Sequence, residues 1–313
     1  MNLQQLRYVS EVARRNLNVS EAAEALHTSQ PGVSKQIRAL EEELGVAIFV
    51  RQGRRFTALT DAGRDLVAAV DRILAELANL RAIGEEFAHH AKGGLAVAVT
   101  HTQARYALPE VVGAFKKRYP EVKLKLLQGN PHQLARMVAA GEADVAIATE
   151  ALDEYPELVT IPCYQWRHCV VVPTGHPLAR VKPLTLEAIA QHPLVTYDPT
   201  FAGRTALDRA FAARGLHPEI VLTALDSDVI KSYVALGLGV GIISSRAFRD
   251  GKDEGLVALD CDHLFPAQTT RLAFRRGAYL RGFTVEFIRL LAPHVRREDL
   301  ESLASGAAEN FEI

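Results

Sequence analysis

Polar side chains suited to DNA recognition are concentrated in residues 28–44. Apolar residues recur there at spacings of four, three and four, which predicts one face of an amphipathic helix. The opposite face carries hydrogen-bond donors and acceptors that match base edges and phosphates, so we expect it to enter a major groove. The side chains expected to contact DNA are Ser29, Gln30, Pro31, Ser34, Lys35 and Arg38. An ordinary amphipathic surface helix is the alternative, and this stretch alone leaves it open.

The first residues of this stretch mark the start of the predicted helix. Ser29 suits the N-cap position because its hydroxyl can accept a hydrogen bond from a free backbone amide. Pro31 falls in the first turn, where its missing N–H interrupts no helical hydrogen bond. The apolar stripe behind them consists of Val33, Ile37, Leu40 and Leu44.

The residues upstream favour the DNA-binding interpretation. Asn18 and Glu21 resemble a capping box, which opens a short alanine-rich helix over residues 20–26. An apolar stripe predicts an earlier helix over residues 3–13. Small alanine side chains allow two helices to cross closely, as a helix-turn-helix requires.

The residues downstream predict a β-hairpin. Two short apolar runs, residues 48–51 and 56–59, flank a turn that contains glycine and arginine. We expect Arg51 and Arg54 to contact phosphates from this hairpin, as the wing of a DNA-binding unit would. Residues 1–60 are therefore predicted to form a winged helix-turn-helix domain.

A long apolar seam follows in residues 61–92, which we predict to be a linker helix and hinge. The seam alternates between spacings of four and three, as in helices that pair with another helix. A monomeric core helix is the alternative, but the domain ahead is too small to cover so long a stripe, so we predict self-association. The seam consists of Leu66, Val70, Ile73, Leu77, Leu80, Gly84 and Phe87. His89 and His90 lack further ligands at suitable spacing, which favours a solvated hinge over a metal site.

From Leu95 the sequence alternates between apolar runs and amphipathic segments, which predicts a mainly parallel sheet covered by helices. The fold class is therefore α/β with an all-α N-terminal part. Two lobes account for residues 93–313, an expected effector-binding domain. The first lobe is predicted from residues 93–162 and 269–293, and the second from residues 163–268. We expect the polar tail after Arg297 to be frayed.

Hydroxyl and amide side chains gather where three predicted strands end. In open α/β sheets, ligands bind at the carboxyl ends of strands, where helix N-termini present free amides. Neutral donors there suit a small oxyanion or a carboxylate bound between the lobes. Threonines that merely cap helices are the alternative at any single strand end. The predicted effector-binding residues are Thr100, Thr102, Gln103, Thr149, Trp166 and Gly203, with Trp166 either stacking on a ligand or filling the contact between lobes.

Composition excludes several classes of protein. The chain has 313 residues, 48% of them hydrophobic, and a formal net charge of −1, which argues against a polybasic protein. We expect a cytoplasmic location, because no secretory signal or membrane-spanning run is evident and the three cysteines form no CxxC pair. A solute-binding protein is the alternative from another class, but it would lack the helix-turn-helix. We expect no catalytic residues, no metal ligands and no enzyme, since serine-elbow, metal-triad and phosphate-loop motifs are absent.

The chain resembles LysR-type transcriptional regulators, and within them the CysB type. The family resemblance rests on the run from Ala22 to Gly63, including Ser29-Gln30-Pro31 and Thr60-Asp61-Ala62-Gly63. The resemblance to the subtype rests on Thr100-His101-Thr102-Gln103, on Ala148-Thr149-Glu150-Ala151-Leu152 and on Pro193-Leu194-Val195-Thr196-Tyr197.

This resemblance implies a winged helix-turn-helix, a dimerising linker helix and two Rossmann-like lobes of the periplasmic-binding-protein type. It implies a homotetramer on double-stranded promoter DNA, with RNA polymerase a further candidate partner. It also implies control of cysteine biosynthesis genes in sulfur assimilation through N-acetylserine, O-acetylserine, sulfate or thiosulfate, with no other cofactor. A regulator of sulfonate or sulfate-ester use that responds to sulfate or adenosine phosphosulfate is the alternative within the subtype.

The anion pocket of the subtype maps onto Thr100, Thr102, Gln103 and Thr149, with Trp166 nearby. One position departs from the pattern. The subtype has a hydroxyl residue directly before Gly203, where this chain has Ala202, so the identity of the effector stays open.

Overall fold

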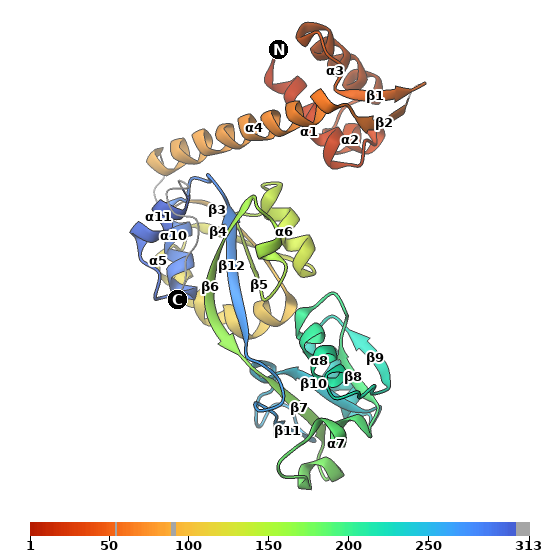
Figure 1. Cartoon of the computed structure of the whole chain (residues 1–313). Coiled ribbons are helices and arrows are strands. Elements are labelled where there is room, and N and C mark those ends of the chain that lie inside the picture. The colour runs from red at the N-terminus through yellow and green to blue at the C-terminus, as the bar shows by residue number, and fades with distance from the viewer. Residues whose placement is uncertain (54, 89–91, 305–313) are drawn as a thin grey trace. The chain divides into compact units, whose positions relative to one another are not determined.

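The computed structural model describes residues 1–53, 55–88 and 92–304 (Figure 1). The chain divides into two compact units, Met1–Gly84 and Glu85–Ile313. None of the described helices combines the length and the apolar character that a membrane span requires.

The N-terminal unit is a three-helix bundle followed by a hairpin and a long helix, as the sequence predicts. Its elements are α1 (Leu3–Arg14), α2 (Val19–Ala25), α3 (Gln30–Leu44), β1 (Phe49–Gln52), β2 (Arg55–Leu59) and α4 (Asp61–Ala88). The predicted caps are present: Asn18 accepts hydrogen bonds from the amides of Ser20 and Glu21, and Ser29 accepts one from Gly32.

The apolar stripes of α1 and α3 form the core of this unit. Val9, Val33 and Ile37 are fully buried. Leu44, predicted as part of the same stripe, is 38% exposed because α3 ends there and Gly45 turns the chain away in a left-handed conformation.

The long helix α4 is buried only near its start. Val70 is 5% exposed and belongs to the core cluster, against which Leu66 and Leu74 also pack. Farther along, Ile73 and Leu80 of the predicted seam are 42% and 65% exposed. The predicted hinge residues His89 and His90 lie outside the described residues.

The C-terminal unit contains two five-stranded sheets. The first has the order β4-β3-β5-β12-β6 and the second the order β11-β7-β10-β8-β9. The strands of the first are β3 (Gly93–Val99), β4 (Val122–Gln128), β5 (Val145–Ala148), β6 (Leu158–Trp166) and β12 (Gln268–Arg275). Those of the second are β7 (His168–Pro173), β8 (Leu194–Tyr197), β9 (Ile220–Ala224), β10 (Val240–Ser244) and β11 (Leu256–Asp260).

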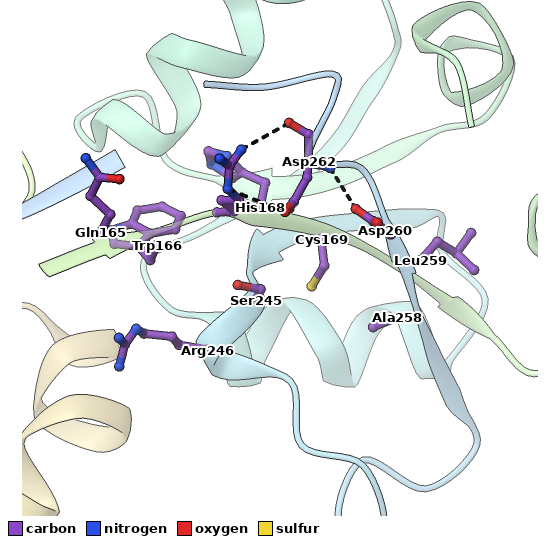
Figure 2. A pocket seen from close by; sticks show the side chains of 11 residues that line it. Gln165, Trp166, His168, Cys169, Ser245, Arg246, Ala258, Leu259, Asp260 and Asp262 are labelled. Carbon is purple, nitrogen blue, oxygen red and sulfur yellow. Dashed lines mark hydrogen bonds and ion pairs between the residues drawn. The ribbon is translucent and has the colours of Figure 1, made fainter. Parts of the chain in front are cut away.

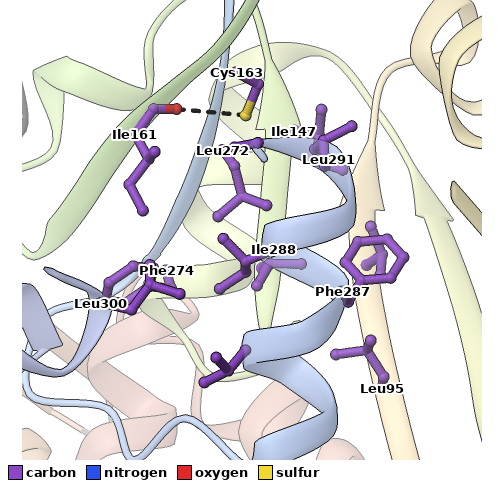
Figure 3. Close-up of a cluster of buried hydrophobic side chains, with 14 of the residues drawn as sticks. Leu95, Ile147, Ile161, Cys163, Leu272, Phe274, Phe287, Ile288, Leu291 and Leu300 are labelled. Atoms are coloured by element: carbon purple, nitrogen blue, oxygen red, sulfur yellow. Dashed lines mark hydrogen bonds between the residues drawn. The ribbon is translucent and has the colours of Figure 1, made fainter. Parts of the chain in front are cut away.

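Helices alternate with these strands. With the first sheet lie the π-helical turn η1 (Gln103–Ala107), α5 (Leu108–Arg118), α6 (Pro131–Ala139), the 3-10 turn η2 (Leu152–Glu154), α10 (Gly282–Leu291) and α11 (Arg297–Ala304). With the second lie η3 (Pro177–Arg180), α7 (Leu186–Ala190), α8 (Ala202–Ala212), α9 (Ser227–Ala235) and η4 (Ser245–Ala247). The core of the first lobe joins α10 to the sheet, and Figure 3 shows Phe287, Ile288 and Leu291 beside Leu95, Ile147, Leu272 and Phe274.

The sheets differ from the predicted mainly parallel arrangement. In the first sheet β3 is parallel to β4 and β5, but β12 is antiparallel to both of its neighbours. Strand β6 extends to Trp166 in the first sheet and β7 begins the second at His168, whereas the sequence placed the lobe boundary at residues 162 and 163.

The expectation of a frayed tail after Arg297 is wrong for the residues up to 304. They form α11, whose Leu300 and Leu303 are 0% and 1% exposed and pack into the core of the first lobe. Two apolar side chains, three positions apart, are enough to anchor this short polar helix. Residues 305–313 lie outside the described residues.

Candidate functional site

The polar face of α3 is exposed, as a DNA-contacting surface must be. Ser29, Gln30, Pro31, Lys35 and Arg38 are exposed, and Ser34 is half-buried. Within the described part of the chain, the side chains of Gln30, Lys35 and Arg38 form no hydrogen bond or ion pair with the protein. Two unpaired cations and an amide therefore remain free to bind phosphates and bases.

The wing is fixed to α3 through one carboxylate. Oε1 of Glu41 accepts hydrogen bonds from the amides of Ile48 (2.8 Å) and Phe49 (3.1 Å), and its Oε2 lies 2.6 Å from Nη2 of Arg51. The Arg51 guanidinium also stacks over the Phe56 ring at 4.7 Å. Arg51 therefore holds the hairpin against the helix, and its contact with phosphate stays a prediction. Arg54 lies outside the described residues.

The predicted effector-binding residues all line one pocket in the C-terminal unit, which we call the strand-end pocket. Thr100 and Thr149 follow β3 and β5, Trp166 ends β6, and Gly203 lies in the first turn of α8. The complete lining is Thr100, Thr102, Gln103, Thr149, Glu150, Trp166, Tyr197, Phe201, Gly203 and Ser244. Residues distant in sequence are thus brought together where ligands bind in open α/β sheets.

Sequence reasoning missed four lining residues, which are Glu150, Tyr197, Phe201 and Ser244. Tyr197 and Ser244 end β8 and β10, so the strand-end rule used for the threonines could have found them. Glu150 directly follows Thr149, but its position in the sequence does not by itself predict that it lines a pocket. In contrast, Thr200, a hydroxyl residue that follows β8, is exposed and its Oγ1 donates to Oδ1 of Asp198 at 2.7 Å, outside the pocket lining.

Hydrogen bonds fix the orientation of the pocket side chains. Nε2 of Gln103 donates to Oγ1 of Thr270 (3.2 Å), while the Tyr164 hydroxyl donates to Oε1 of Gln103. Nε1 of Trp166 donates to Oγ1 of Thr149 (3.2 Å). The Tyr197 hydroxyl accepts from the amide of Ser244 (3.0 Å), and burial raises the pKa of Tyr197 to about 12, so this phenol is neutral. Preorganised neutral groups of this kind suit a small polar ligand.

The N-terminus of α8 meets two ionisable side chains. The amide of Gly203 donates to Oε1 of Glu150 at 3.0 Å. His168 is only 2% exposed, and neither of its ring nitrogens has a hydrogen-bond partner among the described residues. Burial lowers the pKa of His168 to about 4, so the imidazole is neutral near neutral pH.

A larger hollow of about 490 Å³ shares Trp166 with the strand-end pocket (Figure 2). Asp260 and Asp262 lie on one side of it and Arg246 on the other. Asp262 is paired with Arg167, with 3.4 Å between Oδ2 and Nε, so part of its charge is already compensated. The neutral donors of the strand-end pocket are better matched to a small anion.

Neither thiol nor metal chemistry is favoured by the described residues. All three cysteines are buried, and burial raises the pKa of Cys163 and Cys169 to about 12, so these thiols are unreactive. Ligand atoms of His101, Asp226 and Asp228 lie within 4.8 Å of one another. Asp228 is already paired with Arg105 (2.6 Å) and Lys231 (3.3 Å), two cations that would compete with a metal ion.

Comparisons with known proteins agree with a helix-turn-helix in the N-terminal unit and a ligand-binding domain in the C-terminal unit. The family model for bacterial regulatory helix-turn-helix proteins of the lysR family matches residues 3–64, and that for the LysR substrate binding domain matches residues 88–296. The chain belongs to the LysR family of transcriptional regulators. It is a DNA-binding regulator rather than an enzyme, since the family and the relatives are regulators.

Two relatives from Burkholderia cenocepacia are equally similar to this LysR-family regulator. The HTH-type transcriptional regulator CysB is 52% identical over 313 residues, covering 100% of both chains. The HTH-type transcriptional regulator SsuR is 52% identical over 303 residues, covering 97% of this chain and 98% of its own. The crystal structure of the cofactor-binding domain of the Cbl transcriptional regulator matches with a TM-score of 0.66 and 46% identity, covering 68% of this chain and 94% of that domain.

Proposed function

We propose that this regulator controls genes of sulfur assimilation and that its effector, a small sulfur oxyanion or an acetylserine, binds in the strand-end pocket. The observation that carries the proposal is the convergence of Thr100, Thr102, Gln103 and Thr149 around one pocket at the strand ends. The full-length similarity to the regulators CysB and SsuR, and the sequence resemblance to the CysB type, support the sulfur-related assignment.

Calorimetry with the full-length protein tests the pocket. The ligands are N-acetylserine, O-acetylserine, sulfate, thiosulfate and adenosine phosphosulfate. Thr100→Val removes one hydroxyl donor, and losing a hydrogen bond to a charged group should cost about 1.5–3 kcal/mol of binding energy. Thr205→Val is the matched control, because Thr205 is exposed on α8 and outside the pocket lining. Equal binding by Thr100→Val and the wild type would remove the pocket from the proposal.

A regulator of sulfonate or sulfate-ester use is the second candidate, because SsuR is as similar to this chain as CysB is. Binding of adenosine phosphosulfate or sulfate without any binding of acetylserines would favour it.

We further propose that the protein acts in the cytoplasm as a homodimer and homotetramer on double-stranded promoter DNA, with RNA polymerase as a partner there. The exposed apolar residues Ile73 and Leu80 of α4 support self-association through this helix. Ligand binding would then shift the population between assemblies that space their DNA-binding domains differently.

A further inference from the structure

Glu150 is the only charged residue in the described lining of the strand-end pocket. The other polar lining groups are hydroxyls and an amide, which can all donate hydrogen bonds to an oxyanion. One negative charge in a pocket otherwise suited to anions needs an explanation.

The carboxylate of Glu150 occupies the helix N-terminus that lines the pocket. Its Oε1 accepts the hydrogen bond from the amide of Gly203 at 3.0 Å, in the first turn of the 11-residue helix α8. The N-cap residue of α8, Phe201, supplies no side-chain cap. Free amides at a helix N-terminus attract anions, so Glu150, from the first lobe, serves there as an internal anion.

A second observation concerns the buried ring of His168, which lies beside this helix start and lines the neighbouring larger hollow. A Cβ atom built on Gly203 would lie 3.4 Å from Nε2 of His168 and 3.5 Å from the Trp166 ring. His168 is 2% exposed, and its ring nitrogens have no partner among the described residues. An unsatisfied buried polar side chain beside a helix N-terminus is costly unless a ligand or water completes it.

The pocket is small. Its cavity volume is about 30 Å³, and a single water needs ~10–15 Å³. A tetrahedral oxyanion therefore enters only if the lobes separate or a lining side chain moves away.

We propose that Glu150 is a built-in competitor of the anionic ligand: its carboxylate caps α8 in the ligand-free protein, and a small oxyanion or carboxylate binds by displacing it from Gly203. This inference rests on the proposed function, because it takes the strand-end pocket as the effector site. Displacement frees a carboxylate of the first lobe from a helix of the second. Ligand entry is thereby coupled to a change in the contact between the lobes.

Sulfate titrations of the full-length protein test the proposal. Glu150→Gln removes the competing charge, so we expect sulfate to bind at least about tenfold more tightly than to the wild type. Glu150→Asp keeps the charge on a side chain one methylene shorter, which should loosen the contact with Gly203 and give a smaller gain. Glu154→Gln is the matched control, since Glu154 is an exposed carboxylate only four residues away. Its sulfate affinity should equal that of the wild type.

The single tryptophan of the chain provides a second measurement. Trp166 lies beside Gly203 and bonds to Thr149, so its emission should respond when Glu150 leaves α8. Without sulfate, the emission spectrum of Glu150→Gln should resemble that of the sulfate-saturated wild type, and that of Glu154→Gln should not.

Unchanged or weaker sulfate binding by Glu150→Gln, or no binding by any of these proteins, would overturn the proposed competition. The proposed function is judged separately, by whether Thr100→Val weakens the binding of the acetylserines or the sulfur anions. Failure of one proposal can therefore be told apart from failure of the other.

Discussion

Lowering the pH should destabilise the C-terminal unit through His168. Burial lowers the pKa of His168 from 6.5 to about 4. In the unfolded chain this imidazole takes up a proton near pH 6.5, while the folded protein resists protonation until about pH 4. The unfolded state thus binds more protons across this window, and the free energy of unfolding falls as the pH falls.

The size of the effect follows from the shift. One pKa unit corresponds to about 1.4 kcal/mol, so His168 should remove about 3 kcal/mol of stability between pH 6.5 and pH 4. His168→Phe abolishes this contribution and places an apolar ring between Trp166 and Phe265, the two rings that His168 already contacts. His217→Phe is the control, because His217 is exposed.

Denaturant unfolding at several pH values, followed by Trp166 fluorescence, measures the effect. Trp166 is suitable because its ring centroid lies 4.9 Å from that of His168. The wild type and His217→Phe should lose stability more steeply than His168→Phe as the pH falls. Parallel pH profiles for all three proteins would refute the reasoning that His168 is buried in its neutral form.

Three further predictions concern other parts of the chain. Arg38→Ala should weaken specific promoter binding by about 1–3 kcal/mol, measured by fluorescence anisotropy, and an unchanged affinity would remove Arg38 from DNA contact. Leu77→Asp should dissociate oligomers built through α4, and an unchanged mass by light scattering would contradict that interface. Lys231→Met should destabilise the C-terminal unit by about 3–5 kcal/mol. The reason is that Lys231 is buried and bonds to Asp253 at 2.7 Å; an unchanged denaturation midpoint would show that the ion pair contributes little.

Lys231 also links the two lobes. Its Nζ donates to the Tyr106 hydroxyl of η1 (3.1 Å) as well as to Asp253. Burial alone would lower the pKa of Lys231. The hydrogen bonds to Asp253 and Tyr106 have the larger effect, so the pKa of Lys231 is raised above its ordinary value of 10.5. A raised pKa means that this contribution to stability is fully present at neutral pH and is lost only in strong alkali.

The parts of the fold that were predictable from sequence are those with strong local signals. Asn18 and Ser29 mark helix starts by their capping chemistry, and the fully buried strands β8 and β10 are short apolar runs of the kind that predicts strands. Strands β6 and β11 were not predicted. Both lie at the edge of their sheets. The side chains of β11 are only partly buried or exposed, so they show no clear alternation, whereas β6 is largely buried but contains Pro162, a residue that argues against a strand except at a sheet edge.

The pocket was predictable in part for a similar reason. Thr100 and Thr149 lie at strand ends, so the topology of an α/β sheet brings them together. The positions of Glu150 and His168 depend on how the second lobe approaches the first, and no local pattern encodes that distance. Long-range packing also explains α11, because Leu300 is buried in a core that includes strands formed much earlier in the chain, such as β3 and β5.

The attachment of the wing to α3 through Glu41 has a consequence for the choice of DNA sites. Because one carboxylate holds two backbone amides and Arg51, it restrains the distance between the hairpin and the face of α3 that we predict to enter the groove. We therefore expect the double helix to supply the adjustment on binding, by bending or by changing its groove width. Sequences that deform easily on either side of the contacted bases would then be preferred, although no side chain touches them.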